Sequence, residues 1–205
     1  MMQPRFIVIE GIDGSGKTTQ TKCVADHLRT LGQSVEVTTE PTSSTIGSVV
    51  RKLVLLDDCV SEWTALYLFA ADRCDHLDMM VKPALMKGKT VLCDRYVLST
   101  LAYQATSDNG PTLEEAWRIH SHFRAPDLTV FVDIPVAIAL KRLRHRAEVA
   151  HERYENQRRL QAIDAGYHDA MGLLRRFGHR FVVVDGVGSK EEVTERILVA
   201  IASGE

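Results

Sequence analysis

Residues 11–18 read Gly-Ile-Asp-Gly-Ser-Gly-Lys-Thr, a glycine-rich stretch that ends in Lys-Thr. It matches the pattern G-x-x-x-x-G-K-[ST], and it lies between an apolar run, Phe6 to Glu10, and a stretch of helical periodicity. Glycines let backbone N–H groups curl around phosphate oxygens, and the following helix presents its positive N-terminal end to them. The segment therefore predicts a phosphate-binding loop between a buried strand and a helix.

The residues of this loop predict binding of a nucleoside triphosphate with Mg²⁺. Lys17 is expected to hold the β- and γ-phosphates, and the hydroxyl of Thr18 is expected to ligate Mg²⁺. The full set that we expect around the triphosphate is Gly11, Ile12, Asp13, Gly14, Ser15, Gly16, Lys17 and Thr18.

Apolar runs alternate with longer stretches of helical period along the 205 residues. This alternation is typical of strand–helix–strand units around a mostly parallel sheet that is covered on both faces. The sequence therefore predicts a single α/β domain, residues 1–205. The expected strands are Phe6–Glu10, Val35–Thr39, Thr90–Asp94, Leu128–Asp133 and Phe181–Asp185. The expected helices are 17–31, 45–56, 61–87, 97–106, 112–123, 135–146, 151–177 and 189–203.

The composition excludes several classes of partner. With 25 Lys and Arg against 27 Asp and Glu, the net charge is -2, so nothing global recruits nucleic acid or anionic lipid. No run of about 18 uncharged apolar residues and no signal-peptide pattern is present, so we expect a cytoplasmic protein with no membrane span. The four cysteines lack a C-x-x-C pair, which favours buried free thiols over disulfides or zinc.

The third expected strand ends in Cys93-Asp94-Arg95. A mechanical ATPase would have Asp-Glu there, and a GTPase would carry an Asn-Lys-x-Asp element, which this sequence lacks. An arginine after Asp94 puts a cation at the carboxyl edge of the sheet, where ligands bind in open α/β folds. This arrangement favours a kinase acting on an anionic small molecule, and an exposed arginine at a strand end is the alternative.

Residues 141–159 are rich in Lys and Arg. A charged run of this kind is either a solvated helix face or a cationic flap over an anion site, and the phosphate loop supplies such a site. We therefore expect a lid over about residues 141–159.

Several further motifs follow one another in a fixed order from Phe6 to about Val187. They are Glu10-Gly11-Ile12-Asp13-Gly14-Ser15-Gly16-Lys17-Thr18-Thr19, Glu40-Pro41, Leu66-x-x-Phe69-Ala70-Ala71-x-Arg73, Asp94-Arg95-Tyr96-x-x-Ser99-x-x-Ala102-Tyr103-Gln104, Pro126-Asp127-Leu128 and His151-Glu152-Arg153-Tyr154-Glu155-Asn156. In their order and spacing they resemble the thymidylate kinases, P-loop nucleoside monophosphate kinases that phosphorylate dTMP with ATP.

This resemblance implies a three-layer P-loop kinase fold, with a five-stranded parallel sheet, helices on both faces and a helical lid. It implies transfer of the γ-phosphate of ATP to dTMP, with Mg²⁺, to give dTDP and ADP for dTTP biosynthesis. A homodimer built on helix 61–87 is also implied, although a buried core helix would explain the same apolar residues. The alternatives are another nucleoside monophosphate or deoxynucleoside kinase, or a non-catalytic nucleotide-binding module.

The resemblance also implies which residues bind the base. Phe69 would stack on the thymine, and Arg73, one helical turn later, would donate to its O4 atom. Ser99 and Gln104 would contact the base edge. Without the motif, a core phenylalanine and a surface arginine would explain the pair Phe69 and Arg73.

For the sugar and the acceptor phosphate the resemblance implies a second group. Tyr103 would crowd the 2′ position, and Asp13 would meet the 3′-hydroxyl, its alternative role being to stabilise the turn. Arg95 and Arg51 would bind the acceptor phosphate, because planar guanidinium groups suit phosphate oxygens. Glu40 is expected to pair with a water molecule or an arginine on the acceptor side.

The transfer step needs one more cation. Asp94 would help to place Mg²⁺, and Lys17, Asp94, Arg95 and Arg153 form the expected catalytic set. Some family members carry an arginine in the phosphate loop, where this chain has Gly14, so the lid must supply it. Arg153 matches the motif best, and the secondary candidates on the ATP side are Arg142 and Arg146.

Overall fold

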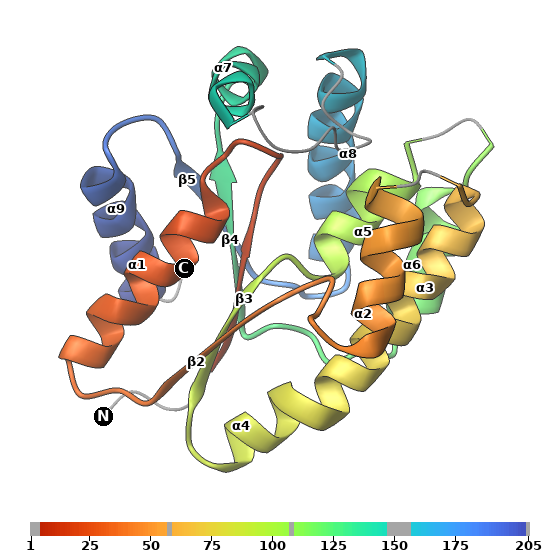
Figure 1. Ribbon diagram of the computed structural model, residues 1–205. Helices are drawn as coiled ribbons and strands as arrows, with labels where there is room; N and C mark the ends of the chain where they lie inside the picture. The colour runs from red at the N-terminus through yellow and green to blue at the C-terminus, as the bar shows by residue number, and fades with distance from the viewer. Residues whose placement is uncertain (1–4, 57–58, 107–108, 147–156, 204–205) are drawn as a thin grey trace.

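The computed structural model describes residues 5–56, 59–106, 109–146 and 157–203. Its centre is a five-stranded sheet in the order β2-β3-β1-β4-β5, and each neighbouring pair of strands is parallel (Figure 1). The strands are β1 Phe6–Glu10, β2 Val35–Thr39, β3 Thr90–Asp94, β4 Leu128–Asp133 and β5 Phe181–Asp185. All five expected strands are confirmed, because short runs buried on both faces leave a clear apolar signature.

The strand order places the phosphate loop at the switch point of the sheet. β1 lies between β3 and β4, so the chain crosses over β1 on its way from β3 to β4. In register, Ile9 of β1 and Thr39 of β2 both pair with Asp94 of β3. The carboxyl ends of the three strands therefore meet at one edge, where open α/β sheets bind their ligands.

Helices cover both faces of the sheet, as Figure 1 shows. They are α1 Lys17–Thr30, α2 Thr45–Val50, α3 Glu62–His76, α4 Lys82–Met86, α5 Val97–Gln104, α6 Leu113–His120, α7 Val136–Arg146, α8 Gln157–Arg175 and α9 Lys190–Ser203. Ile7 and Ile9 of β1 pack with α1 and α9 in one core cluster, while Phe6 and Val8 pack with α5 and α8 in another. The expected three-layer α/β architecture is confirmed.

Two of the expected helices contain π-helical turns that the sequence did not predict. Helix 45–56 changes from α2 into the π-helical segment η1, Arg51–Leu56, and helix 61–87 carries the π-helical segment η2, Leu77–Val81, between α3 and α4. Pro83 lies in the first turn of α4. Because proline has no N–H and clashes with the carbonyl four residues earlier, regular α-helix cannot continue through this position.

The expectation of buried thiols is wrong for most of the cysteines. All four are free, but Cys59 and Cys74 are exposed and Cys23 is half-buried, so only Cys93 of β3 is buried. Cys74 lies on α3 on the side that faces solvent. Within the described ranges, no helix combines the length and the apolar character that crossing a membrane requires.

Helix α8 approaches α5 closely at Gly166. A Cβ atom at this position would lie 2.8 Å from the carbonyl oxygen of Ala102 and 2.8 Å from Thr106 Cγ2. Gly172, two turns later on the same helix, has nothing within 4 Å of such an atom. Packing therefore requires a glycine at position 166 but not at position 172, and the two positions can be compared directly because both lie on α8.

We expect Gly166→Ala to destabilise the protein by about 1–3 kcal/mol, because the helices must move apart to admit the methyl group. Gly172→Ala should instead stabilise it by about 1 kcal/mol, because alanine is the better helix former. Urea unfolding of both variants measures the two changes. Equal effects of the two substitutions would contradict this account of α8.

Candidate active site

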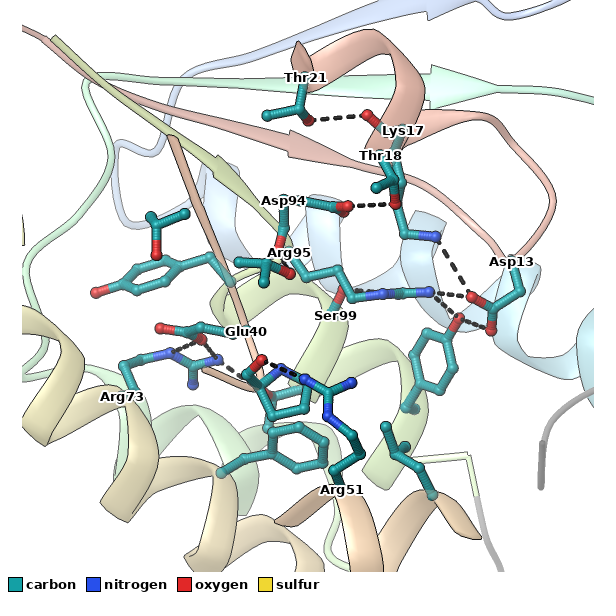
Figure 2. Close-up of a pocket in the computed structure, with 18 of the residues that line it drawn as sticks. Asp13, Lys17, Thr18, Thr21, Glu40, Arg51, Arg73, Asp94, Arg95 and Ser99 are labelled. Carbon is teal, nitrogen blue, oxygen red and sulfur yellow. Dashed lines mark hydrogen bonds and ion pairs between the residues drawn. The ribbon is translucent and has the colours of Figure 1, made fainter. Parts of the chain in front are cut away.

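A cleft of about 600 Å³ opens at the carboxyl edge of the sheet, between the phosphate loop, α3 and α5 (Figure 2). Most of the site residues expected from the sequence line it. They are Asp13, Gly14, Gly16, Lys17, Thr18, Glu40, Arg51, Phe69, Arg73, Asp94, Arg95, Ser99, Tyr103 and Gln104. Segments far apart in the sequence thus meet in one cavity, whose size suits small-molecule ligands.

The phosphate loop can form only because glycines occupy its bends. Gly16 precedes the first residue of α1, Lys17, and has a φ of 92°, which is the left-handed region. Gly14 has a φ of 83°, and a Cβ atom there would lie 2.6 Å from the carbonyl oxygen of Ala139. A longer side chain at Gly14 is therefore excluded both by conformation and by the start of α7.

The carboxylate of Asp13 joins the two sides of the cleft. Its Oδ1 atom accepts from Lys17 Nζ at 3.3 Å and also from Arg95 Nη2, and its Oδ2 atom accepts from Tyr103 at 2.7 Å (Figure 2). Burial alone would raise the pKa of Asp13, but Arg95 and Lys17 outweigh burial and hold this pKa well below its usual range. Burial and the charge of Arg95 lower the pKa of Lys17. One carboxylate thus pairs with two cations, buried Lys17 and half-buried Arg95.

Asp94 and Thr18 form a set of oxygen atoms beside the loop. Thr18 Oγ1 donates to Asp94 Oδ2 at 2.5 Å. The other carboxylate oxygen, Asp94 Oδ1, is buried and has no hydrogen-bond partner among the residues that the structure describes. A buried carboxylate oxygen without a donor, next to a hydroxyl group, is a donor set that Mg²⁺ prefers. The residues present therefore fit a magnesium ion.

Arg73 lies at the other end of the cleft and is 1% exposed. Its guanidinium donates to Glu40 Oε2 from Nε at 2.9 Å and from Nη2 at 2.6 Å. Glu40 also contacts His76 Nδ1 at 2.9 Å. The arginine partner expected for Glu40 is thus Arg73, and the interpretation of Arg73 as a surface residue is excluded.

Two neutral groups also accept hydrogen bonds from Arg73. Nη2 donates to the hydroxyl of Thr100 at 3.0 Å, and Nη1 contacts His120 Nδ1 at 2.7 Å. Burial and the charge of Arg73 lower the pKa of His120 to about 2, so this imidazole is neutral and can accept. Four of the five N–H donors of Arg73 are thereby used, which fixes the plane of the guanidinium.

Arg51 reaches the cleft from the π-helical segment η1. Its side chain is exposed, and Nη2 donates to the carbonyl oxygen of Pro41 at 3.0 Å. Phe69 is half-buried and lines the same cavity. The arrangement provides an apolar ring, Phe69, and a long cationic side chain, Arg51, on the side of the cleft away from the phosphate loop.

Arginines of the expected lid lie partly within the described residues. Arg142 on α7 donates from Nη1 to the carbonyl oxygens of Gly14 at 3.4 Å and Ser15 at 3.2 Å, so it contacts the phosphate loop directly. Arg146 is the last residue of α7, and its side chain lies outside the described part. Arg153 lies outside the described residues as well.

Comparison with known proteins identifies the family. The thymidylate kinase family model matches residues 9–197. The chain belongs to the thymidylate kinase family. It is 38% identical to "Thymidylate kinase" of Desulfosudis oleivorans, with 96% of this chain and 95% of that protein covered. It is 37% identical to "Probable thymidylate kinase" of Pyrococcus abyssi, with 98% and 97% covered, and 38% identical to "Thymidylate kinase" of Nostoc sp., with 96% and 94% covered.

Within this thymidylate kinase fold, α5 carries two polar faces, and on the second face the sequence predicted Gln104 but not Thr100. Ser99 and Tyr103 face Arg95, whereas Thr100 faces Arg73 and lines the cleft with Gln104. Because 99 and 103, and likewise 100 and 104, are one helical turn apart, the helical period could have revealed Thr100. The hydroxyl of Ser99 donates to Glu10 Oε2, with 2.5 Å between the two oxygen atoms, so its proton is not available to a base edge.

We expect Asp13→Asn to destabilise the ligand-free protein by about 2–4 kcal/mol, because Lys17 and Arg95 lose their shared anion. Since the pKa of Asp13 is depressed on folding, this difference is fully present above about pH 4 and shrinks as the pH falls further. The same variant should bind tripolyphosphate several-fold more tightly, because the competing carboxylate is gone. Chemical unfolding against pH and calorimetric titration measure these effects.

The control is Asp26→Asn, which removes the carboxylate from an exposed ion pair with Arg29 on α1. This change should alter the free energy of unfolding by less than about 1 kcal/mol and leave tripolyphosphate affinity unchanged. Weaker tripolyphosphate binding by Asp13→Asn would contradict the role given to its carboxylate.

Proposed function

We propose that this chain is an ATP-dependent thymidylate kinase that transfers the γ-phosphate of ATP to dTMP, yielding dTDP and ADP. One observation carries the proposal: Lys17 of the phosphate loop and Arg95 at the sheet edge contact the same oxygen atom of Asp13. Two cations placed face to face in one cleft suit two phosphates that must approach each other. Membership in the thymidylate kinase family supports this choice of substrates.

Phosphoryl transfer depends mainly on positioning and on neutralisation of charge. Lys17 and the N-terminus of α1 would hold the β- and γ-phosphates of ATP. Thr18 and Asp94 would hold Mg²⁺, which neutralises charge on the phosphate oxygens when it is bound. Arg95, together with Arg51, would bind the phosphate of dTMP on the opposite side.

The remainder of the cleft suits a thymidine moiety. Phe69 would stack on the base, and the remaining N–H of Arg73 would donate to O4. Gln104 would contact the base edge, together with Thr100 on the same face of α5. The hydroxyl of Ser99 is engaged with Glu10 instead. Tyr103 would crowd a 2′-hydroxyl, and Asp13 would accept from the 3′-hydroxyl.

We assign the catalytic arginine to the lid. Gly14 leaves no room for a side chain in the loop, and Arg142 is engaged with loop carbonyl oxygens. Arg153, which matches the family motif best among the lid arginines, would reach the transferring phosphate and complete the catalytic set of Lys17, Asp94 and Arg95, with Arg142 and Arg146 on the ATP side.

We also propose that the protein acts in the cytoplasm as a single-domain subunit of a homodimer. The two largest apolar clusters pack on the same sheet, which favours one domain. On α3, Tyr67 is 57% exposed and stacks with half-buried Trp63 at 6.4 Å, so these two residues would contribute to a dimer contact. Leu66 belongs to the core and Phe69 to the cleft, and neither is needed for that contact.

Coupled release of ADP from Mg-ATP tests the substrate directly. With dTMP, dUMP, dCMP, UMP, AMP and thymidine as acceptors, we expect dTMP to give the highest kcat/KM. The acceptor phosphate is needed because Arg51 and Arg95 have no task with a nucleoside. Preference for thymidine would indicate a nucleoside kinase, and no release with any acceptor would indicate a binding module.

Arg153→Ala tests the origin of the catalytic cation. We expect kcat to fall by roughly 10³, as for other arginines that stabilise phosphoryl transfer, with a much smaller change in dTMP affinity. Arg176→Ala, on the surface beyond α8, is the control and should leave kcat unchanged. Equal activity of wild type and Arg153→Ala would remove Arg153 from the catalytic set.

A further inference from the structure

Glu10, the last residue of β1, is wholly buried and has no role in the reaction described above. Its carboxyl group accepts from the backbone N–H groups of Tyr96 at 2.8 Å and Ser99 at 3.1 Å. It also accepts from the hydroxyl groups of Ser99 at 2.5 Å and Tyr167 at 3.2 Å. Burial raises the pKa of Glu10, whereas Ser99 and Arg95 oppose that rise. In every one of these contacts the carboxyl group is the acceptor.

The two hydroxyl groups also contact Arg95. Ser99 Oγ and the Tyr167 hydroxyl lie 2.8 Å apart, and Arg95 Nη1 donates to them at 3.0 and 3.1 Å. Each hydroxyl group has a single proton, and an ionised carboxylate can only accept. The proton of Ser99 therefore goes to Glu10, and that of Tyr167 goes to Glu10, Ser99 or the carbonyl oxygen of Gly11 at 3.1 Å. Both hydroxyl groups are left with lone pairs for Arg95.

The other end of the Arg95 guanidinium is engaged with the phosphate-loop side. Nη2 donates to Asp13 and, at 3.1 Å, to the hydroxyl of Tyr103. Only Nε has no acceptor among the described residues. Arg95 also has a φ of 72°, a left-handed conformation that a residue other than glycine keeps only when its surroundings fix it.

We propose that Glu10 and Tyr167, acting with Ser99, are positioning residues that hold Arg95 by its Nη1 end, so that Nε, the donor without an acceptor among the described residues, meets the acceptor phosphate. The inference rests on the proposed function, in which Arg95 binds that phosphate. Glu10 acts at one remove: it accepts a hydrogen bond from Ser99 and is one of the acceptors for Tyr167, and the hydroxyl oxygen atoms then orient the guanidinium.

Packing of α8 does not require the Tyr167 hydroxyl. The ring of Tyr167 packs against Phe131 at 5.1 Å and against Tyr103 at 6.0 Å between ring centroids. Phenylalanine would keep both contacts. A buried hydroxyl group carries a desolvation cost that an apolar core would avoid, and here that group is directed at Arg95.

Tyr167→Phe tests the proposal through the contribution of one phosphate group. We expect the Kd for dTMP to rise about tenfold, because a hydrogen bond to a charged group is lost, while the Kd for thymidine changes less than about twofold. The KM for ATP should stay constant and kcat with dTMP should fall. A purely structural role would weaken dTMP and thymidine binding equally.

Glu10→Gln is a second variant with the same shape and the opposite hydrogen-bonding character. Its amide N–H₂ group would donate to Ser99 or Tyr167, and the displaced hydroxyl proton would turn toward Arg95 Nη1. We expect a larger loss of dTMP affinity than in Tyr167→Phe, again with little change in thymidine affinity. The matched control is Ile163→Val, one turn earlier on α8 and wholly buried, which should lower stability alone.

Each outcome supports or overturns the proposal. A loss specific to dTMP in Tyr167→Phe or Glu10→Gln supports it, and so does an unaltered nucleotide affinity in Ile163→Val. Equal losses for dTMP and thymidine, or no loss in either folded variant, overturn it while leaving the kinase assignment intact. A wild-type protein that does not bind dTMP would instead overturn the proposed function and this inference together.

Discussion

The ion pairs of Asp13 with Lys17 and Arg95 are the constraint on which the rest of the cleft depends. Two cations in a buried site repel each other strongly, because the surroundings screen their charges poorly. The loop supplies one carboxylate between them, and Tyr103 fixes its second oxygen atom. Lys17 and Arg95 can therefore lie in one cleft, facing each other across a shared anion.

The short helix α5 divides this cleft into two ends. Ser99 and Tyr103 point to Arg95 and the phosphate end, whereas Thr100 points to Arg73 and the opposite end. Consecutive positions on one helix thus serve two different arginines. Because α5 packs against both α3 and α8, a shift of this helix would disturb both ends of the cleft at once.

Sequence reasoning reached the sheet and the phosphate loop because both depend on local patterns: apolar runs for β1 to β5, and glycine spacing for residues 11–18. It did not predict the π-helical segments, because these form hydrogen bonds between residues five apart, and the apolar pattern does not distinguish that spacing from the spacing of an α-helix. The direction of Ser99 was also out of reach. That direction is set by Glu10, which is 89 residues away in the sequence and a neighbour only after the sheet forms.

Arg73 and Arg95 are held in place by the same kind of arrangement. Each has one directly bound carboxylate, Glu40 or Asp13, which balances the charge of the guanidinium. Of the remaining donors of each arginine, all but one go to neutral acceptors: Thr100 and His120 for Arg73, and hydroxyl groups for Arg95. Neutral acceptors orient a guanidinium without adding negative charge. A second carboxylate in direct contact would orient the guanidinium equally well but would repel a phosphate, so hydroxyl groups are the better means of holding Arg95 if it binds the acceptor phosphate as proposed.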